Sequence, residues 1–255
     1  MIRSKACRSG RKVLITGATG GIGLAAARRF AENGDSLFLH GFQNRERIER
    51  LKEEFPGTEI ETFFCDLGSP VSQDELAERA WRWSGSGIDV FVQAAGVDIL
   101  TGSRKNWTYE EKLEALWKVD VQAGIRLARN VSSRLVEAGR HGVILMIGWD
   151  AVEWGMSGDS AELFAAAKGA VTSFVRCLAQ KTGPNVRVNC LAPGWIQTRW
   201  GLNAPEPWKE YARKDSLLNR WGTPEDMAEA MFFLASEEAS FLNAVVLPVD
   251  GGKRF

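Results

Sequence analysis

Short runs of β-branched and apolar residues alternate with amphipathic stretches along nearly the whole chain, and this alternation constrains the fold most strongly. The apolar runs lie at 12–16, 36–40, 59–64, 88–93, 142–147, 186–192 and 244–250. Stretches with helical periodicity separate them, at about 21–33, 44–55, 70–84, 109–138, 160–182 and 224–236. Helices of this length between strands indicate right-handed βαβ crossovers and a buried parallel sheet. The pattern therefore predicts an α/β fold, doubly wound, with a parallel sheet of about seven strands.

One irregular segment interrupts the alternation, at about 194–226, between the sixth and seventh apolar runs. Ligands of open α/β sheets bind outside the carboxyl ends of the strands, so a long excursion at this place predicts a lid. The sequence contains no repeat, low-complexity tract or linker. We therefore expect residues 1–255 to form a single domain that carries this lid insertion.

Charge and composition exclude several classes of function. Lysine and arginine total 32 and aspartate and glutamate total 32, so no overall field favours nucleic acid or an anionic membrane. The four cysteines are scattered without a CxxC pair, which argues against a metal site and a disulfide framework. No stretch reaches the roughly 18 to 20 apolar residues of a membrane span. We expect a cytoplasmic protein with a small-molecule substrate, and neither a nucleic acid nor a membrane as partner.

A glycine-rich loop follows the first apolar run and opens the first helical stretch. Gly17, Gly21 and Gly23 have the spacing GxxxGxG. Glycines there permit a tight turn and close approach of the backbone to a pyrophosphate, while the helix N-terminus offers unpaired N–H groups and partial positive charge. In this strand–loop–helix context the pattern predicts a dinucleotide-binding domain of the Rossmann type.

Motifs from about residue 10 to residue 252 together make the chain resemble the short-chain dehydrogenase/reductase family. CDL (65–67) stands where the family places an aspartate against adenine, and QAAG (93–96) stands for its NAAG turn. APGWIQT (192–198) is similar to its PGxxxT motif. With the glycine loop, the resemblance implies cofactor contacts by Thr19, Ile22, Asp66, Leu67, Ala94, Gly96, Pro193, Gly194, Ile196 and Thr198. It also implies a homodimer or homotetramer formed through the helices at about 112–138 and 160–182.

The segment after the second apolar run bears on the choice of nicotinamide cofactor. An acid at the end of that strand would bind the ribose 2′-hydroxyl of NAD, whereas basic residues would accept the phosphate of NADP. The segment offers a histidine, polar residues and two arginines, and no acid before Glu46: His40, Gln43, Asn44, Arg45 and Arg47. We therefore expect NADP(H) to be preferred, with NAD(H) as the alternative.

The segment FAAAK (164–168) resembles the catalytic YxxxK motif of the family but lacks its tyrosine. In the family that tyrosine is the general acid/base, and the lysine binds the nicotinamide ribose and lowers the tyrosine's pKa. Lys168 matches this lysine, whereas Phe164 stands in place of the tyrosine and Asp120 in place of an asparagine. The serine position is occupied by Trp149 on an ungapped count, or by Asp150 if the loop shifts by one residue.

A phenyl ring supplies no proton, and a well-placed general acid is worth about 10²–10⁴ in rate, so ordinary ketone reduction is expected to be severely impaired. A replacement acid would come from Asp150, Asp120, Asp159 or Glu162. Asp159 and Glu162 also fit a capping box that starts the next helix, and Asp120 also fits a buried core carboxylate. Pterin reductases of the family carry an aspartate at the serine position, which favours Asp150.

The leading hypothesis is an oxidoreductase that transfers hydride to a planar, pterin-like substrate with a C=N group. Asp150 would be its acid or cation partner, and Phe164 with Trp149 would form an apolar wall. One alternative is a catalytically silent dinucleotide-binding protein that acts as a sensor or scaffold. The other is a carbonyl (3-oxoacyl-type) reductase with a substitute proton donor.

Overall fold

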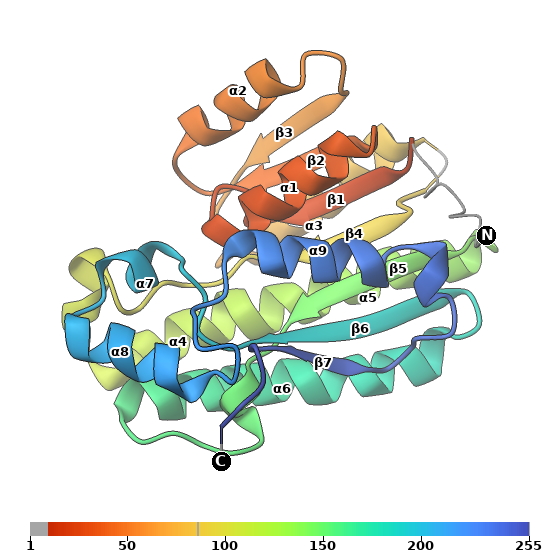
Figure 1. The fold of residues 1–255 in the computed structure, drawn as a ribbon. Helices are drawn as coiled ribbons and strands as arrows, with labels where there is room; N and C mark the ends of the chain where they lie inside the picture. Colours follow the sequence, from red (N-terminus) through yellow and green to blue (C-terminus); the bar gives the residue numbers. More distant parts are fainter. Residues whose placement is uncertain (1–9, 86, 255) are drawn as a thin grey trace, which may run out of the picture.

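The computed structural model describes residues 10–85 and 87–254, and it confirms the α/β fold (Figure 1). The sheet within these residues has seven strands in the order β3-β2-β1-β4-β5-β6-β7, and every neighbouring pair is parallel. The strands are β1 (Lys12–Thr16), β2 (Ser36–Gly41), β3 (Ile60–Phe64), β4 (Val90–Gln93), β5 (Gly142–Ile147), β6 (Val186–Pro193) and β7 (Val246–Val249). The last strand starts two residues later than expected, because Ala244 has a left-handed backbone with φ 60°.

Helices cover both faces of the sheet. The longer ones are α1 (Gly21–Glu32), α2 (Arg45–Glu54), α3 (Pro70–Ser84), α4 (Tyr109–Leu116), α5 (Gly124–Glu137), α6 (Asp159–Thr182), α8 (Glu206–Asp215) and α9 (Pro224–Leu234). Apolar residues of α1, α2 and α9 pack on one face, and those of α3, α5 and α6 on the other. The two layers give each strand an apolar neighbour on both sides, as a buried parallel sheet requires.

The predicted helix over 109–138 is divided into three parts. After α4, residues Trp117–Ala123 form a π-helical segment, and α5 continues from Gly124. A π turn inserts an extra residue and re-aims the side chains of that turn, and such turns recur at functional sites. Here the π segment contains Asp120, whose side chain is buried.

The predicted lid is a folded segment between β6 and α9. It contains the short helix α7 (Arg199–Asn203) and helix α8, which lie together beyond the carboxyl ends of the strands (Figure 1). Four tryptophans and one tyrosine pack on one another at its centre: Trp195, Trp200, Trp208, Tyr211 and Trp221. No helix among residues 10–85 and 87–254 has the length and apolar character to cross a membrane.

Candidate active site

The glycine loop joins β1 to α1 at the point where the strand order reverses. Gly17 has a left-handed backbone (φ +68°), and a Cβ on it would lie 2.7 Å from the carbonyl oxygen of Ala94. A Cβ on Gly23 would lie 2.3 Å from the carbonyl oxygen of Gly17. A Cβ on Gly21, by contrast, would meet only Pro224 and Thr198, at 3.6 Å and 3.8 Å. Packing therefore requires glycine at positions 17 and 23, whereas a Cβ at position 21 would make only ordinary van der Waals contacts.

The first turn of α1 is available to an anion. Its N-cap residue is Gly20, to which no side chain in the described part of the chain supplies a capping hydrogen bond, and no acidic residue lies in the first turn. Thr108 with Glu111 caps α4, and Thr223 with Asp226 caps α9, whereas α2, α3, α6 and α8 likewise begin without a side-chain cap in the described structure. A helix N-terminus left uncapped in this way presents N–H donors and partial positive charge.

The turn after β4 is tied to the glycine loop by polar side chains. The hydroxyl of Thr16 donates to Oε1 of Gln93 at 2.5 Å, and the backbone N–H of Ala95 donates to the same hydroxyl at 3.3 Å. The amide of Gln93 also donates to the carbonyl of Ala95 at 3.3 Å. Gln93 therefore fixes the Ala94–Gly96 turn beside Gly17, although the resembling family has asparagine there.

His40 is a structural residue of the glycine loop. Its ring is buried, Nδ1 accepts from the backbone N–H of Gly17 at 3.3 Å, and Nε2 lies 3.1 Å from the carbonyl oxygen of Cys65. Burial lowers the pKa of His40 to about 4. Both ring nitrogens are therefore bound within the protein. The geometry favours a structural role for His40 over the predicted cofactor contact.

Two arginines flank the loop on the same side. A guanidinium nitrogen of Arg47 donates to the carbonyl of Thr19 at 3.0 Å, which places its charge against the glycine loop. The guanidinium of Arg45 lies over the ring of Phe64, 4.1 Å from the centroid. Asn44 is the N-cap residue of α2 and has a left-handed backbone with φ 60°. The structure thus gathers the predicted basic residues beside the end of β2.

The remaining predicted cofactor residues lie along the same edge of the sheet. Asp66 is exposed and its Oδ1 accepts from the backbone N–H of Gly68 at 2.8 Å, while Leu67 is buried in the core. Pro193 ends β6, and the N–H of Gly194 donates to the carbonyl of Val249. Ile22 and Ile196 pack in the same apolar cluster. Thr198 is the N-cap residue of α7 and lies next to the position of a Cβ on Gly21.

Trp149, one of the two residues that the sequence offers at the serine position, contacts Phe164. The ring of Trp149 meets that of Phe164 edge to face, with 6.2 Å between the centroids. These two rings therefore form an apolar pair, and their placement at the hydroxyl positions of the resembling family stays a prediction.

Lys168 is held by Asp120. Its Nζ lies 2.7 Å from Oδ2 of Asp120, and the exposed fractions of the two side chains are 13% and 2%. Oδ1 of Asp120 accepts from the backbone N–H of Val97 at 2.8 Å. The lysine is therefore neither a surface side chain nor free in the site, and an ion-paired carboxylate at position 120 is a poor candidate for a proton donor.

Asp150 lies in a separate group of charges at the carboxyl ends of β5, β6 and β7. Only 8% of it is exposed, and Oδ1 accepts from the N–H of Ala151 at 2.8 Å. Oδ2 lies 3.3 Å from the position of a Cβ on Gly194. Burial raises the pKa of Asp150 to about 6; the Ala151 N–H and Lys253 oppose this, while Asp250 and Asp215 add to it.

The capping box expected at the start of α6 is wrong. Gly158 is the N-cap residue, and neither Asp159 nor Glu162 supplies the expected bonds in the described structure. Glu162 accepts instead from the hydroxyl of Tyr109 at 3.4 Å, so it joins α6 to α4. Gly158 has a φ of 109°, a backbone conformation that glycine adopts readily, and as glycine it has no side chain that could cap the helix.

Comparisons with known proteins agree with this arrangement. Residues 17–254 match a family model described as Enoyl-(Acyl carrier protein) reductase. The chain is also 30% identical over 248 residues to the 3-oxoacyl-[acyl-carrier-protein] reductase FabG of Thermotoga maritima, covering 95% of this chain and 97% of that protein. The chain belongs to the short-chain dehydrogenase/reductase family. Its members among the matches are oxidoreductases.

Other members of the short-chain dehydrogenase/reductase family show the same similarity. A 2,3-dihydro-2,3-dihydroxybenzoate dehydrogenase of Bacillus subtilis is 32% identical over 258 residues, with 95% of each chain covered. A solved short-chain dehydrogenase from Burkholderia cenocepacia in complex with NADP superimposes with a TM-score of 0.85 at 26% identity, covering 96% of this chain and 98% of that one. These similarities establish the fold and the family over nearly the full length.

Three charged residues near Asp150 were not singled out from the sequence. Nζ of Lys253 lies 2.5 Å from Oδ2 of Asp215, which also accepts from the indole N–H of Trp195 at 3.0 Å. The third is Asp250, next to Gly194. These residues come from the lid and from the loop after β7, so no local spacing joins them to Asp150. The only signal was the resemblance of the C-terminal LPVDGG segment to the family.

Proposed function

We propose that this member of the family is an NADP(H)-dependent oxidoreductase that acts on a planar, pterin-like substrate with a C=N group. The observation that carries the proposal is Asp150: a carboxyl only 8% exposed, with a pKa raised to about 6 by burial. The rings of Phe164 and Trp149, which we place at the hydroxyl positions of the family, contact each other edge to face. A titratable acid therefore remains at the carboxyl ends of the strands, while the phenol needed for a ketone is absent from position 164.

The residues of the site fit a nicotinamide dinucleotide. The uncapped start of α1, where Gly21 carries no side chain, suits a pyrophosphate, and Arg47 and Arg45 suit a ribose phosphate. A solved 7α-hydroxysteroid dehydrogenase complexed with NADH resembles this chain as well as the NADP complex does, with a TM-score of 0.86. The choice of NADP(H) therefore depends on the two arginines and not on the comparisons.

We propose that the buried carboxyl of Asp150 donates the proton in this reaction. The reduced cofactor, when bound, supplies the hydride that adds to the carbon of the C=N group. The nitrogen takes a proton from the Asp150 carboxyl, and the resulting carboxylate regains a proton from solvent. If the nitrogen is already protonated, the carboxylate instead stabilises the cation electrostatically. The rings of Phe164 and Trp149 offer flat apolar surface to a heteroaromatic ring.

Single-turnover oxidation of NADPH, followed by its absorbance, tests the proposal against a panel of ketones, imines and dihydropterins. We expect oxidation with the C=N acceptors, little with ketones, and a loss of about 10²–10⁴ in rate in Asp150→Asn with a neutral imine. Equal rates with ketones would show a carbonyl reductase with a substitute donor, and the proposal would be wrong.

A catalytically silent dinucleotide-binding protein is the second candidate, favoured by one observation. Lys168 is already paired with Asp120, and Phe164 and Trp149 carry no hydroxyl group, so the family's lysine is kept while the hydroxyl groups expected beside it are absent. NADPH binding without oxidation by any acceptor of the panel would identify this case. A sensor or scaffold of this kind would also bind NADPH equally well in the Asp150→Asn variant.

We propose NADP(H) as the preferred cofactor because Arg47 lies against the glycine loop. Arg47→Gln is expected to weaken NADPH binding roughly tenfold or more, as loss of a charge-assisted hydrogen bond does, and to change NADH binding little. Titration of each cofactor by fluorescence measures both affinities. An equal loss for the two cofactors would place the arginine away from the phosphate.

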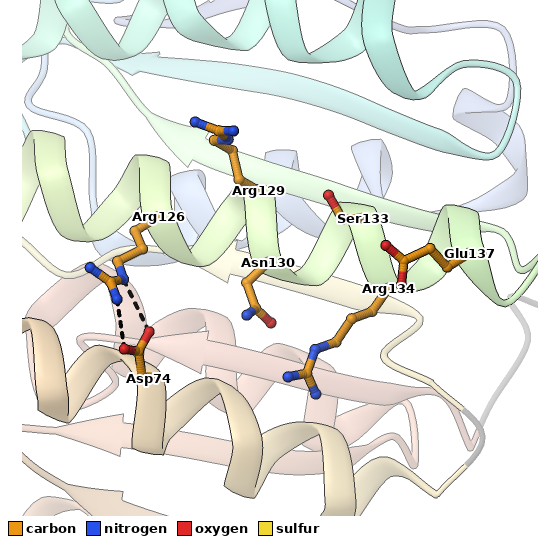
Figure 2. A pocket seen from close by; sticks show the side chains of 7 residues that line it. All are labelled: Asp74, Arg126, Arg129, Asn130, Ser133, Arg134 and Glu137. Atoms are coloured by element: carbon orange, nitrogen blue, oxygen red, sulfur yellow. Dashed lines mark hydrogen bonds and ion pairs between the residues drawn. The ribbon is translucent and has the colours of Figure 1, made fainter.

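We also propose that the chain forms a homodimer or homotetramer through the outer face of α5. Figure 2 shows a groove there between α3 and α5, in which Arg126 is paired with Asp74. Oδ1 of Asn130 in this groove is buried without a hydrogen-bond partner among the described residues. Light scattering is expected to give two or four times 28.2 kDa, and Arg129→Glu to lower that mass.

A further inference from the structure

The ion pair between Asp120 and Lys168 changes the electrostatics of the site independently of Phe164. Lys168 lies one helical turn after position 164, on the same face of α6. An unpaired ammonium one helical turn away would lower the pKa of an acidic side chain at position 164 by about 1–3 units. Here a carboxylate lies 2.7 Å from the ammonium, so the two charges largely cancel.

Asp120 is fixed from three directions. The π segment brings it inward from the helix, the N–H of Val97 donates to one carboxylate oxygen, and Lys168 binds the other. A Cβ on Gly96 would lie 2.8 Å from Oδ2, so the turn after β4 closes over the pair. The carboxylate is therefore placed by the backbone of two elements and determines where Lys168 points.

Burying an ammonium group without an anion beside it costs free energy of folding, and the pairing of Lys168 with Asp120 avoids this cost. Phe164 cannot become an anion. The carboxylate of Asp120 therefore supplies the negative charge that keeps Lys168 in the site. We propose that Asp120 is a positioning residue that holds Lys168 against the turn after β4 and cancels its charge, so that the site no longer supports a phenolate at position 164.

The pKa of a phenol introduced at position 164 tests this inference directly. Phe164→Tyr alone is expected to give a phenol with a pKa at or above the ordinary value of about 10. Phe164→Tyr combined with Asp120→Asn is expected to lower that pKa by about 1–3 units, because Lys168 then acts unopposed. Absorbance at 295 nm as a function of pH measures both, after subtraction of the native chain with its two tyrosines.

A phenol pKa already below about 9 in the single variant would overturn the proposal, as would a double variant with no lower value than the single. Asparagine is chosen because its side-chain oxygen can still accept from the N–H of Val97. The titration needs neither substrate nor cofactor, so its outcome is independent of whether the chain transfers hydride.

A second measurement avoids the introduced tyrosine. Competitive acetylation followed by mass spectrometry compares the reactivity of Lys168 in the native chain and in Asp120→Asn. We expect at least a several-fold increase at Lys168, because the ion pair with the carboxylate no longer holds the amine away from the reagent. The matched control is Asp215→Asn, which removes the partner of Lys253 and should leave Lys168 unchanged. Unaltered reactivity of Lys168 in Asp120→Asn would contradict the proposal.

Discussion

Two buried titratable side chains, His40 and Asp150, respond to burial in opposite directions. Burial lowers the pKa of His40 to about 4, and it raises the pKa of Asp150 to about 6. The unfolded chain therefore binds more protons than the folded chain at His40, and fewer at Asp150, over nearly the same range of pH. Between about pH 4 and pH 6 the contribution of His40 to the free energy of unfolding therefore rises with pH, while that of Asp150 falls.

His40→Asn is expected to cost most stability at neutral pH, and the cost should shrink as the pH falls from about 6.5 toward 4. Below pH 6.5 the native chain loses up to about 1.4 kcal/mol per pH unit at His40, and the variant does not. Asp150→Asn should show the reverse, because the buried carboxyl stabilises the fold only while protonated and loses that contribution as the pH rises through 6.

Urea unfolding at several pH values, with each variant compared with the native chain, measures these differences. Because the comparison is made pairwise, the surface carboxylates that titrate in all three proteins cancel. If the two substitutions changed the free energy of unfolding with the same pH slope, burial would not be the cause of both shifts.

Among the structural elements, the glycine loop separates a folding role from a binding role. A methyl group on Gly23 would collide with the carbonyl of Gly17, whereas one on Gly21 meets only ordinary contacts. Gly23→Ala is therefore expected to destabilise the fold, by about 1–3 kcal/mol as overpacking does. Gly21→Ala should leave stability unchanged or slightly higher and still weaken NADPH binding, because the added methyl group lies at the expected pyrophosphate site.

Thermal unfolding and NADPH titration of the two variants check this pair. The matched substitution Gly57→Ala, in open surface space, should change neither quantity. Normal NADPH affinity in a fully folded Gly21→Ala variant would place the phosphates elsewhere.

The segment 194–226, which the sequence predicts to be a lid, is stabilised by its own aromatic cluster. Trp221 is 7% exposed, its indole N–H donates to the carbonyl of Lys209 at 2.9 Å, and its ring lies 5.8 Å from that of Trp195. Trp221→Ala is expected to cost about 3–5 kcal/mol locally. Hydrogen exchange should accelerate over 195–221 and remain slow in the strands. Phe241→Ala, which removes a fully exposed ring, is the control and should alter neither region.

At the scale of the domain, the buried ion pair of Arg11 joins distant parts of the chain. Arg11 and Asp35 lie 2.6 Å apart with 6% and 0% of their side chains exposed, and Arg11 also donates to the carbonyl of Ala235 at 3.0 Å. Its guanidinium lies near the rings of Phe30 and Phe232. The start of the sheet, the α1–β2 turn and the end of α9 are thus held by one side chain.

Asp35→Ala is expected to lower the free energy of unfolding by about 3–5 kcal/mol, because it leaves Arg11 buried without a countercharge. Glu54→Gln removes the exposed partner of Arg28 and should cost about 0–1 kcal/mol. Urea unfolding of both variants measures the contrast. Similar losses would show that Arg11 reaches water once the carboxylate is gone.

Local features of the sequence were sufficient for the order of strands and helices, the glycine loop and the position of Lys168, because each depends on neighbours within about one helical turn or one strand. Contacts between residues far apart in the sequence could not be predicted from the spacing of motifs. Asp120 is paired with a lysine 48 positions later, and Asp215, Asp250 and Lys253 gather around Asp150. Parallel strands bring their carboxyl ends to one edge of the sheet, so the side chains that meet there are decided by the packed chain. That packing selected Trp149, and not Asp150, as the neighbour of Phe164.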